Sequence, residues 1–422
     1  MSTSVDVVIV GGGPAGLAAA IELRRLGVGR VVVLEREQQA GGIPRHTDHL
    51  GFGVRDMRLV LRGPAYAARY ARLARDAGVE VRTGTSVTGW AGPRTLELTS
   101  AEGRAQLAAP AVLLATGCRE RPRAARLVPG SRPLGVLTTG TLQQLVYLHH
   151  QPVGRRAVIV GAEHVSFSAA LTLARAGARP VAMITDQPRH QTYAPLVWLA
   201  AGRRGVGVLT SSAVTYILGR PRVEAVEVTD LVSGAVREIA CDTVVFTGDW
   251  IPEHELARSA DLVMDPATRA PRVDGALRTS APGVFAAGNL LHGAETADVA
   301  ALSGRYAARS VGAFLRSGVW PTRPPIAVEC EAPLRWVSPS AIDAAAGTSS
   351  DATAGAVPHG SFLLRVSAFI ERALLEVRQD DRRLWQQGYR RLVPNRSIHA
   401  SAAWIREVDP SGGPIRVRVS RA

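Results

Sequence analysis

The residues with the clearest chemical pattern lie near the N-terminus. Gly11, Gly13 and Gly16 follow the β-branched run Val7–Val10 and precede a stretch with apolar residues at helical spacing. In such a strand–turn–helix, the first glycine permits a tight turn, the second lets the backbone approach a pyrophosphate, and the third lets the helix pack closely against the strand. Glu35 ends the next predicted strand and can accept hydrogen bonds from ribose hydroxyls. The pattern therefore predicts a dinucleotide site.

A second segment repeats this order about 150 residues further along the chain. Its turn, predicted over Gly161–Ser166, keeps the first glycine, but Glu163 replaces the second and Ser166 the third. Ser166 is small enough for close packing, whereas Glu163 puts a carboxylate where a pyrophosphate would lie. Two like charges about 4 Å apart repel by roughly 4 kcal/mol at an effective dielectric of 20, or about a thousandfold in affinity. Asp186 would suit an NAD ribose. Two interpretations stay open: NAD(P)H binding, and a vestigial or repurposed domain, which we favour.

The elements that must position these residues alternate between strand and helix, which predicts an α/β fold. Helices are expected after each glycine turn, and another from Gly63 to Gly78. Residues 283–315 hold a strand and an Ala-rich helix, too little for a domain, so we expect them to complete one of the earlier sheets. Beyond residue 359, segments alternate at strand period, with Asp380 and Asp381 at a hairpin turn. The sequence thus predicts two Rossmann-like dinucleotide-binding domains and a small C-terminal β-rich module.

The composition excludes several classes of protein. Of the 422 residues, 46% are hydrophobic and 20% are charged, which provides for large cores and argues against disorder. The net charge of +14 comes from arginine alone, because the sequence contains no lysine. No run of five basic residues occurs. We therefore interpret the arginines as a sign of base bias in the gene and expect no nucleic-acid partner.

The cysteines Cys118, Cys241 and Cys330 lie far apart in the sequence, and no C-x-x-C motif occurs. This spacing argues against a zinc ribbon, a cysteine-ligated iron–sulfur cluster and a local redox disulfide, and we expect no metal site. The apolar runs have the length of strands, so no membrane-spanning helix is expected. The N-terminus lacks the pattern of a secretory signal, which predicts a cytoplasmic protein.

Two further segments carry a resemblance to a known family. Leu114–Gly117 ends the first unit, and Thr279–Asn289 lies far downstream. Together with the glycine turn, they make about residues 1–316 resemble the two-dinucleotide-domain flavoproteins of the pyridine nucleotide–disulfide oxidoreductase type. Within that family the sequence looks closest to the FAD-binding α subunits of amino-acid, opine and cyanide-forming dehydrogenases. The resemblance implies an FAD domain in two parts (1–118 and 249–320) around an inserted NAD(P)-like domain (119–248). The Pro-, Ser-, Ala- and Gly-rich composition of residues 321–358 predicts a linker or irregular layer, and the β-rich module spans residues 359–422.

The resemblance also implies that FAD lies across the first domain, with Gly288 and Asn289 beside the ribityl chain. The family usually has Asp at the position of Asn289, but an amide oxygen can still accept a hydrogen bond from a ribityl hydroxyl. The helix that begins near Thr296 would direct backbone N–H groups at the pyrimidine edge of the flavin. The expected FAD-binding residues are Gly11, Gly13, Pro14, Ala15, Gly16, Glu35, Arg36, Gly42, Ile43, Arg45, Val87, Ala115, Thr116, Gly117, Gly288, Asn289, Glu295, Thr296 and Ala297.

The glycine-bounded segment 41–53 holds the candidate catalytic residues Arg45, His46 and His49. The resemblance implies that this segment passes near the isoalloxazine ring. Either histidine could accept a substrate proton while a hydride moves to the flavin, because imidazole titrates near neutrality. Arg45 could hold a substrate carboxylate or a flavin phosphate. The alternative is a solvated loop with a structural arginine on the FAD pyrophosphate.

These expectations give one main function and two alternatives. The main one is an FAD-dependent dehydrogenase or oxidase that takes a hydride from a small organic substrate, by resemblance an amine or amino acid. Electrons would pass to oxygen, a quinone or a partner subunit. Thiol–disulfide exchange is excluded because the expected flavin site has no pair of thiolates. The alternatives are an NAD(P)H-dependent flavoprotein reductase and an FAD-bearing structural subunit of a heteromeric dehydrogenase.

Overall fold

The computed structural model describes residues 5–193, 206–293, 295–344 and 357–421. The chain forms two compact units. Unit 1 comprises Met1–Arg45, Leu50–Cys118 and Pro252–Ala422, and unit 2 comprises His46–His49 and Arg119–Ile251. No sequence pattern predicted that the short segment His46–His49 belongs with the second unit.

The centre of unit 1 is a parallel sheet in the order β20-β9-β1-β2-β5. Its strands are Val7–Val10 (β1), Val31–Leu34 (β2), Glu80–Arg82 (β5), Ala111–Leu114 (β9) and Val284–Ala286 (β20). Every residue of β1, β2 and β9 is buried, which explains their uninterrupted apolar sequences. The pairing of β20 with β9 confirms that the downstream piece completes the first sheet.

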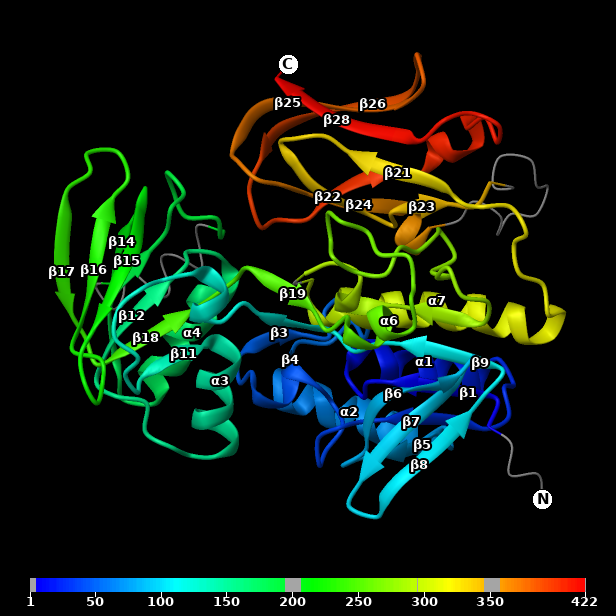
Figure 1. Ribbon diagram of the computed structural model, residues 1–422, viewed down its shortest axis with the longest axis horizontal. Coiled ribbons are helices and arrows are strands. Elements are labelled where there is room, and N and C mark those ends of the chain that lie inside the picture. Colours follow the sequence, from blue (N-terminus) through cyan, green and yellow to red (C-terminus); the bar gives the residue numbers. More distant parts are fainter. Residues whose placement is uncertain (1–4, 194–205, 294, 345–356, 422) are drawn as a thin grey trace. The chain divides into compact units, whose positions relative to one another are not determined.

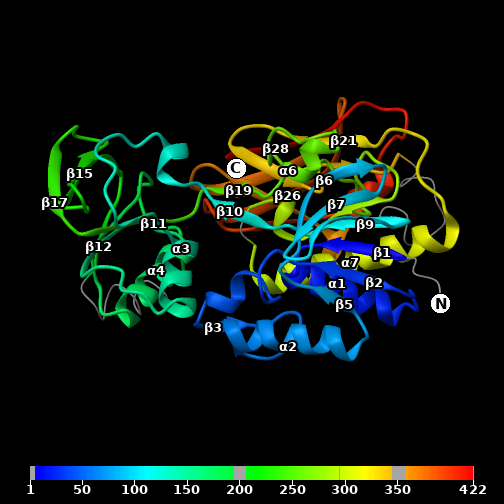
Figure 2. The ribbon, with the colours of Figure 1, turned by 60° about the horizontal axis from the view of Figure 1, so that its bottom comes forward.

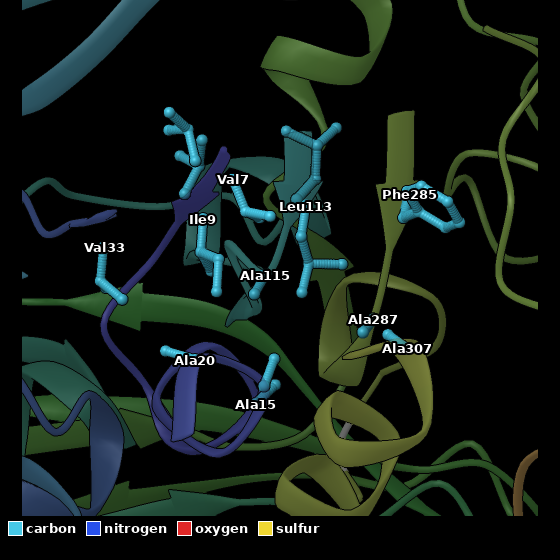
Figure 3. Packing of buried hydrophobic residues seen from close by; sticks show 14 of the residues in the cluster. Val7, Ile9, Ala15, Ala20, Val33, Leu113, Ala115, Phe285, Ala287 and Ala307 are labelled. Carbon is cyan, nitrogen blue, oxygen red and sulfur yellow. The ribbon is translucent and has the colours of Figure 1, made fainter. Parts of the chain in front are cut away.

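Helices α1 (Pro14–Arg25), α2 (Gly63–Asp76) and α7 (Ala297–Ser317) pack on this sheet. Figure 3 shows Ala15 and Ala20 of α1 below the strand residues, with Ala307 of α7 beside them. A Cβ added at Gly304 of α7 would lie 2.0 Å from the Ala15 carbonyl oxygen. Small residues therefore let α7 approach the start of α1 closely.

The remaining elements of the first part of unit 1 are short. An antiparallel meander is made of β6 (Ser86–Gly92), β7 (Thr95–Ser100) and β8 (Gly103–Ala108). Figure 2 shows this meander and α2 on opposite sides of the parallel sheet. The others are β3 (Leu50–Phe52), β4 (Leu61–Arg62), α6 (Glu255–Ser259) and the 3-10 turns at Ile43–His46 and Gly288–Leu290.

Unit 2 contains a second parallel sheet, in the order β11-β18-β12-β13-β14. Its strands are Val136–Thr138 (β11), Arg156–Val160 (β12), Arg179–Ile184 (β13), Gly207–Leu209 (β14) and Thr243–Phe246 (β18). Its helices are α3 (Thr139–Gln143), continued by a π-helical turn (Gln144–Leu148), α4 (His164–Arg175) and a 3-10 turn (Arg123–Arg126). An antiparallel sheet is formed by β15 (Ser212–Leu218), β16 (Ala225–Asp230) and β17 (Val236–Ala240), and β10 (Cys118–Glu120) pairs with β19 (Trp250–Pro252).

The C-terminal part of unit 1 consists of two sheets around a core of its own. Their orders are β23-β21-β28-β25-β26 and β22-β24-β27. The strands are Ile326–Cys330 (β21), Leu334–Ser338 (β22), Ala341–Ile342 (β23), Ser361–Val366 (β24), Ile370–Gln379 (β25), Arg382–Leu392 (β26), Ile398–Ser401 (β27) and Ile415–Arg421 (β28), with 3-10 turns at Pro358–Gly360 and Ala403–Glu407. The predicted hairpin at Asp380 and Asp381 is confirmed between β25 and β26.

The linker predicted at 321–358 is wrong where the structure describes it, because β21, β22 and β23 lie there; its residues 345–356 fall outside the described ranges. β21 pairs with β28, and β22 pairs with β24. Both pairings join strands that are distant in the sequence. Tertiary pairing therefore outweighs the proline- and serine-rich local composition that suggested a linker.

Candidate functional site

The first glycine turn in unit 1 has the geometry that its sequence predicts. Gly11 has a φ of +108°, and a Cβ there would lie 2.4 Å from the Ala115 carbonyl oxygen. A Cβ at Gly16 would lie 1.9 Å from the Gly11 carbonyl oxygen. Both positions therefore require glycine, because a side chain would collide with backbone.

Gly13 differs from these two, because the space beside it is open. It is the N-cap of α1, and the nearest atom to an added Cβ is the Gly42 Cα at 3.9 Å. Pro14 follows at the first helical position, and within the described chain no side chain caps this helix. The backbone N–H groups at the start of α1, including that of Ala15, thus have no side-chain cap among the described residues and are available to an anion.

Glu35 lies directly beside this turn and is buried. Its Oε2 accepts the Gly12 N–H at 2.9 Å, and its Oε1 accepts the Glu37 N–H at 2.8 Å. A carboxylate has about four lone-pair sites, so two such bonds fix its orientation and leave capacity for ribose hydroxyls.

The segment after β2 folds back onto the turn. Gly41 donates its N–H to the Gly12 carbonyl oxygen at 2.7 Å, and Gly42 has a φ of +61°. Arg45 donates from Nη1 to Glu37 at 2.9 Å, while its buried Nε has no hydrogen-bond partner in the described part of the chain. Ile43 is exposed. An unpaired guanidinium donor close to an open helix N-terminus suits a phosphate.

The end of β9 forms another edge of the site. Ala115 donates its N–H to the Val10 carbonyl oxygen at 2.8 Å, and Thr116 donates from Oγ1 to the Glu253 carbonyl oxygen at 2.7 Å. Glu253 also donates its N–H to Gly117 and pairs with Arg36 at 3.7 Å. Sequence reasoning missed Glu253, since no motif includes it. Val87 lies on β6, half-buried, and pairs with Leu98 in the meander.

Asn289 ties together the loop that precedes α7. Gly288 has a φ of +72° and donates its N–H to Ser303 at 3.1 Å. The Asn289 amide nitrogen donates to the Glu295 carbonyl oxygen at 3.0 Å, and the amide oxygen accepts the Glu295 N–H at 3.2 Å. Asn289 thus has a structural role that the sequence did not predict. One lone pair of its oxygen is left for a ribityl hydroxyl.

The N-terminal end of α7 is built from several segments of unit 1. Thr296 is the N-cap, and Ala297 begins the helix as predicted. Asp298, buried in the first turn, accepts the N–H groups of Gly53 at 3.0 Å and Arg55 at 2.9 Å. Sequence reasoning missed Asp298, although an acidic residue in the first turn of an Ala-rich helix is a recognisable signal.

In unit 2, the corresponding turn is filled by its own side chains. α4 begins at His164, within the predicted turn, and Glu163 is its N-cap. The Glu163 carboxylate accepts the Val165 N–H and the Ser166 hydroxyl, the latter at 2.8 Å. Ser166 also lies 2.6 Å from the Thr247 hydroxyl. An internal carboxylate therefore occupies the helix N-terminus where a dinucleotide phosphate would bind.

A second carboxyl group, Glu120, is buried in the same unit. It accepts the Gly140 N–H at 2.8 Å. Burial raises its pKa to about 7, and the charge of Glu163 adds to the rise, while the hydrogen bond from Gly140 opposes it.

The raised pKa of Glu120 predicts a pH-dependent stability that E120Q should remove. Between its ordinary value of 4.5 and about 7, the folded chain keeps a proton that the unfolded chain releases. Stability contributed by Glu120 should therefore fall by roughly 3 kcal/mol as pH rises through this window, and stay constant above it. Urea unfolding of wild type and E120Q at pH 5 and pH 8 measures the difference. A difference in the free energy of unfolding between wild type and E120Q that is the same at pH 5 and pH 8 would contradict the raised pKa of Glu120.

The candidate catalytic histidines lie in the segment that belongs to unit 2. His46 is buried and His49 is half-buried. Thr47 donates to Gln143 of α3 at 3.1 Å, and Asp48 lies 3.6 Å from Arg175 of α4. Contacts with these two helices thus hold the histidine segment, whereas Arg45 belongs to unit 1.

The described residues offer little support for thiol chemistry, for a metal site or for a membrane-spanning helix. The three cysteines are free, and burial raises the pKa of Cys241 to about 12 and of Cys330 to about 11. No group of three or more His, Cys, Asp or Glu side chains in the described ranges could hold a metal ion. Nor does any helix in these ranges have the length and apolar character needed to cross a membrane.

Comparisons with known proteins agree with this geometry. The family described as "Pyridine nucleotide-disulphide oxidoreductase" matches residues 5–304. The hydrogen cyanide synthase subunit HcnB of Pseudomonas protegens is 37% identical over 142 residues, which cover 32% of this chain and 29% of that protein. A thioredoxin reductase of Treponema pallidum is 26% identical over 69% of this chain and 90% of its own. The crystal structure of T. acidophilum thioredoxin reductase matches with a TM-score of 0.63 and 24% identity, over 75% of this chain and 100% of that one, which shows a shared fold.

Proposed function

The chain belongs to the pyridine nucleotide-disulphide oxidoreductase family of FAD-binding flavoproteins, and from this premise we propose that it is an NAD(P)H-dependent flavoprotein reductase. It would transfer two electrons from NAD(P)H to an acceptor outside the chain. The proposal keeps the cytoplasmic location predicted from the sequence. The sequence is compatible with this reaction class, and the family match favours it over amine oxidation.

The single observation that carries the proposal is that unit 2 repeats the frame of unit 1. In unit 2 the helix α4 connects the parallel strands β12 and β13. In unit 1 the helix α1 connects β1 and β2 in the same way. Gly161 has a φ of +138°, and Asp186 comes shortly after the end of β13. The unit thus offers a pyridine nucleotide a strand–turn–helix and a ribose acceptor, with Glu163 as the feature that lowers its affinity.

The residues of unit 1 fit FAD. Gly13 and the open start of α1 would hold the pyrophosphate, Glu35 a ribose, and Arg45 a phosphate oxygen through its unpaired Nε. Gly288, Asn289 and the N–H groups at the start of α7 would serve the ribityl chain and the ring. When bound there, FAD supplies the capacity to accept two electrons as a hydride and to release them to a different acceptor.

The electrons would leave to oxygen, a quinone or a partner subunit. A disulfide acceptor within the chain would need two adjacent thiols, and all three cysteines are free in the structure. The high pKa values of Cys241 and Cys330 also keep these thiols protonated and unreactive near pH 7.

A second candidate function is oxidation of an amine or amino acid in a complex with a partner subunit. Glu163 supports it, because an internal carboxylate at α4 competes with any dinucleotide phosphate. The similarity of one third of the chain to a cyanide synthase subunit supports it as well. In this case His46 or His49 would accept the substrate proton and Arg45 would hold a carboxylate.

Anaerobic titration of the FAD-loaded protein distinguishes the two functions. NADH, NADPH and a panel of amines and amino acids are added separately, and the visible absorption of the flavin is recorded. Reduction by NADH or NADPH, and by none of the amines, is the expected result. Reduction by an amine and not by either nucleotide would replace the first proposal with the second.

A further inference from the structure

The C-terminal sheets of unit 1 contact the loop before α7 through a buried ion pair. Arg365 of β24 donates from Nη2 to Glu295 Oε1 at 2.7 Å, and the exposed fractions of the two side chains are 7% and 5%. Ser397 donates to the same carboxylate oxygen, and Arg365 also donates to the Asn395 carbonyl oxygen. Although burial raises the pKa of Glu295, the charges of Arg365 and His292 and the bond from Ser397 hold it below its ordinary value.

The Glu295 backbone connects this pair to Asn289, one of the expected FAD-binding residues. The Asn289 side chain accepts the Glu295 N–H and donates to its carbonyl oxygen, at 3.2 Å and 3.0 Å. Thr296, the N-cap of α7, comes next in the chain. Asn289 is thus hydrogen-bonded to the backbone of Glu295, and the Glu295 side chain is hydrogen-bonded to Arg365 in the C-terminal sheets.

A stack of side chains makes a second connection between the same two parts. His292, in the loop before α7, stacks on Trp336 of β22 with 5.2 Å between ring centroids. The Arg365 guanidinium lies 5.7 Å from the centre of the same Trp336 ring. Both connections therefore converge on Arg365.

A small pocket borders the two parts where they meet. Gly288, Asn289 and His292 line it from the loop before α7, and Ser338 and Leu363 line it from β22 and β24. In Figure 1, β22 and β24 lie on the side of α7 opposite to α1. The C-terminal sheets thus contact the loop before α7 from the side of α7 that faces away from α1.

We propose that Arg365 and Glu295 are a positioning pair through which the C-terminal sheets fix the loop before α7 and the backbone N–H groups at the start of that helix. The inference rests on FAD binding in unit 1, as proposed above, and is independent of which reductant the enzyme uses. Breaking the pair frees the Glu295 loop, so the chain should hold FAD less tightly and the flavin should be reduced at a different potential.

The test compares variants of the FAD-loaded protein. R365Q removes one partner, and E295Q/R365M removes both buried charges, which guards against misfolding because no unpaired charge stays buried. R418Q is the matched control, since it breaks the Arg418–Glu331 ion pair within the C-terminal sheets, at 2.9 Å, without touching the loop before α7. The measurements are the rate of FAD release and the midpoint potential of the flavin during reduction by dithionite with a reference dye.

We expect both Arg365 variants to release FAD at least about tenfold faster than wild type, which corresponds to about 1.4 kcal/mol, and to show a shifted midpoint potential. R418Q should match wild type in both measurements. Wild-type release and potential in a folded Arg365 variant would overturn the inference, and so would equal changes in R418Q. Because dithionite is the reductant, failure of the NAD(P)H proposal would leave this test unaffected.

Discussion

Replacing Gly13 by alanine should weaken FAD binding while leaving the fold intact. The new Cβ would meet only the Gly42 Cα, at 3.9 Å, and the backbone at Gly13 has a φ of −80° that alanine adopts without strain. The methyl group would, however, fill the space where the pyrophosphate approaches the backbone. Overpacking of this kind costs typically about 1–3 kcal/mol, so FAD affinity should fall by about 5- to 140-fold.

Two other glycines in unit 1 make this prediction specific. Gly92→Ala is the matched control, because its added Cβ has open space around it, and it should bind FAD like wild type. Gly16→Ala should instead fail to fold normally, since its Cβ would lie 1.9 Å from the Gly11 carbonyl oxygen. Circular dichroism reports folding, and FAD titration reports affinity. A Gly13→Ala protein that keeps wild-type FAD affinity would show that the cofactor does not lie at this turn.

Replacing Glu163 by glycine should strengthen NADH binding by up to about a thousandfold. The variant restores the second glycine of the motif and removes the carboxylate from the N-terminus of α4. Repulsion between this charge and a phosphate about 4 Å away is roughly 4 kcal/mol at an effective dielectric of 20. Glycine is an acceptable N-cap, so the loss of stability should be limited to about 1 kcal/mol.

The dissociation constant of NADH from the FAD-loaded protein measures this effect, and E238Q supplies the control. Glu238 is exposed on β17, so its neutralisation changes the net charge equally without altering the α4 turn. Wild type should bind NADH more weakly than low-micromolar, and E238Q should equal wild type. Equal affinity of Glu163→Gly and wild type would mean that unit 2 does not bind the nucleotide through this turn.

Local patterns were sufficient to predict most of the parallel sheets. The runs in β1, β2 and β9 are apolar throughout because both faces are buried, and the glycine turns mark where each helix begins. The downstream strand β20 was correctly expected to complete an earlier sheet, since residues 283–315 are too few to form one. The strands β21 and β22 were missed because they are defined by partners elsewhere in the chain.

The candidate site could be predicted from the sequence only where its residues lie in one continuous segment with a recognisable spacing. The turn at Gly11–Gly16 and Glu35 belong to one strand–helix–strand unit, so sequence spacing was informative. The hydrogen bonds Thr47–Gln143 and Arg365–Glu295 join residues that are 96 and 70 positions apart in the sequence. No sequence motif marks the two residues of either pair as partners. Only the fold brings these partners together. The catalytic roles of His46 and His49 stay predictions.

The cofactor content of the purified protein shows directly whether unit 1 binds FAD. The protein is denatured, and the released cofactor is identified and quantified by chromatography. We expect FAD, at about one molecule per chain after reconstitution with excess cofactor. A colourless protein that takes up neither FAD nor any other flavin would contradict it.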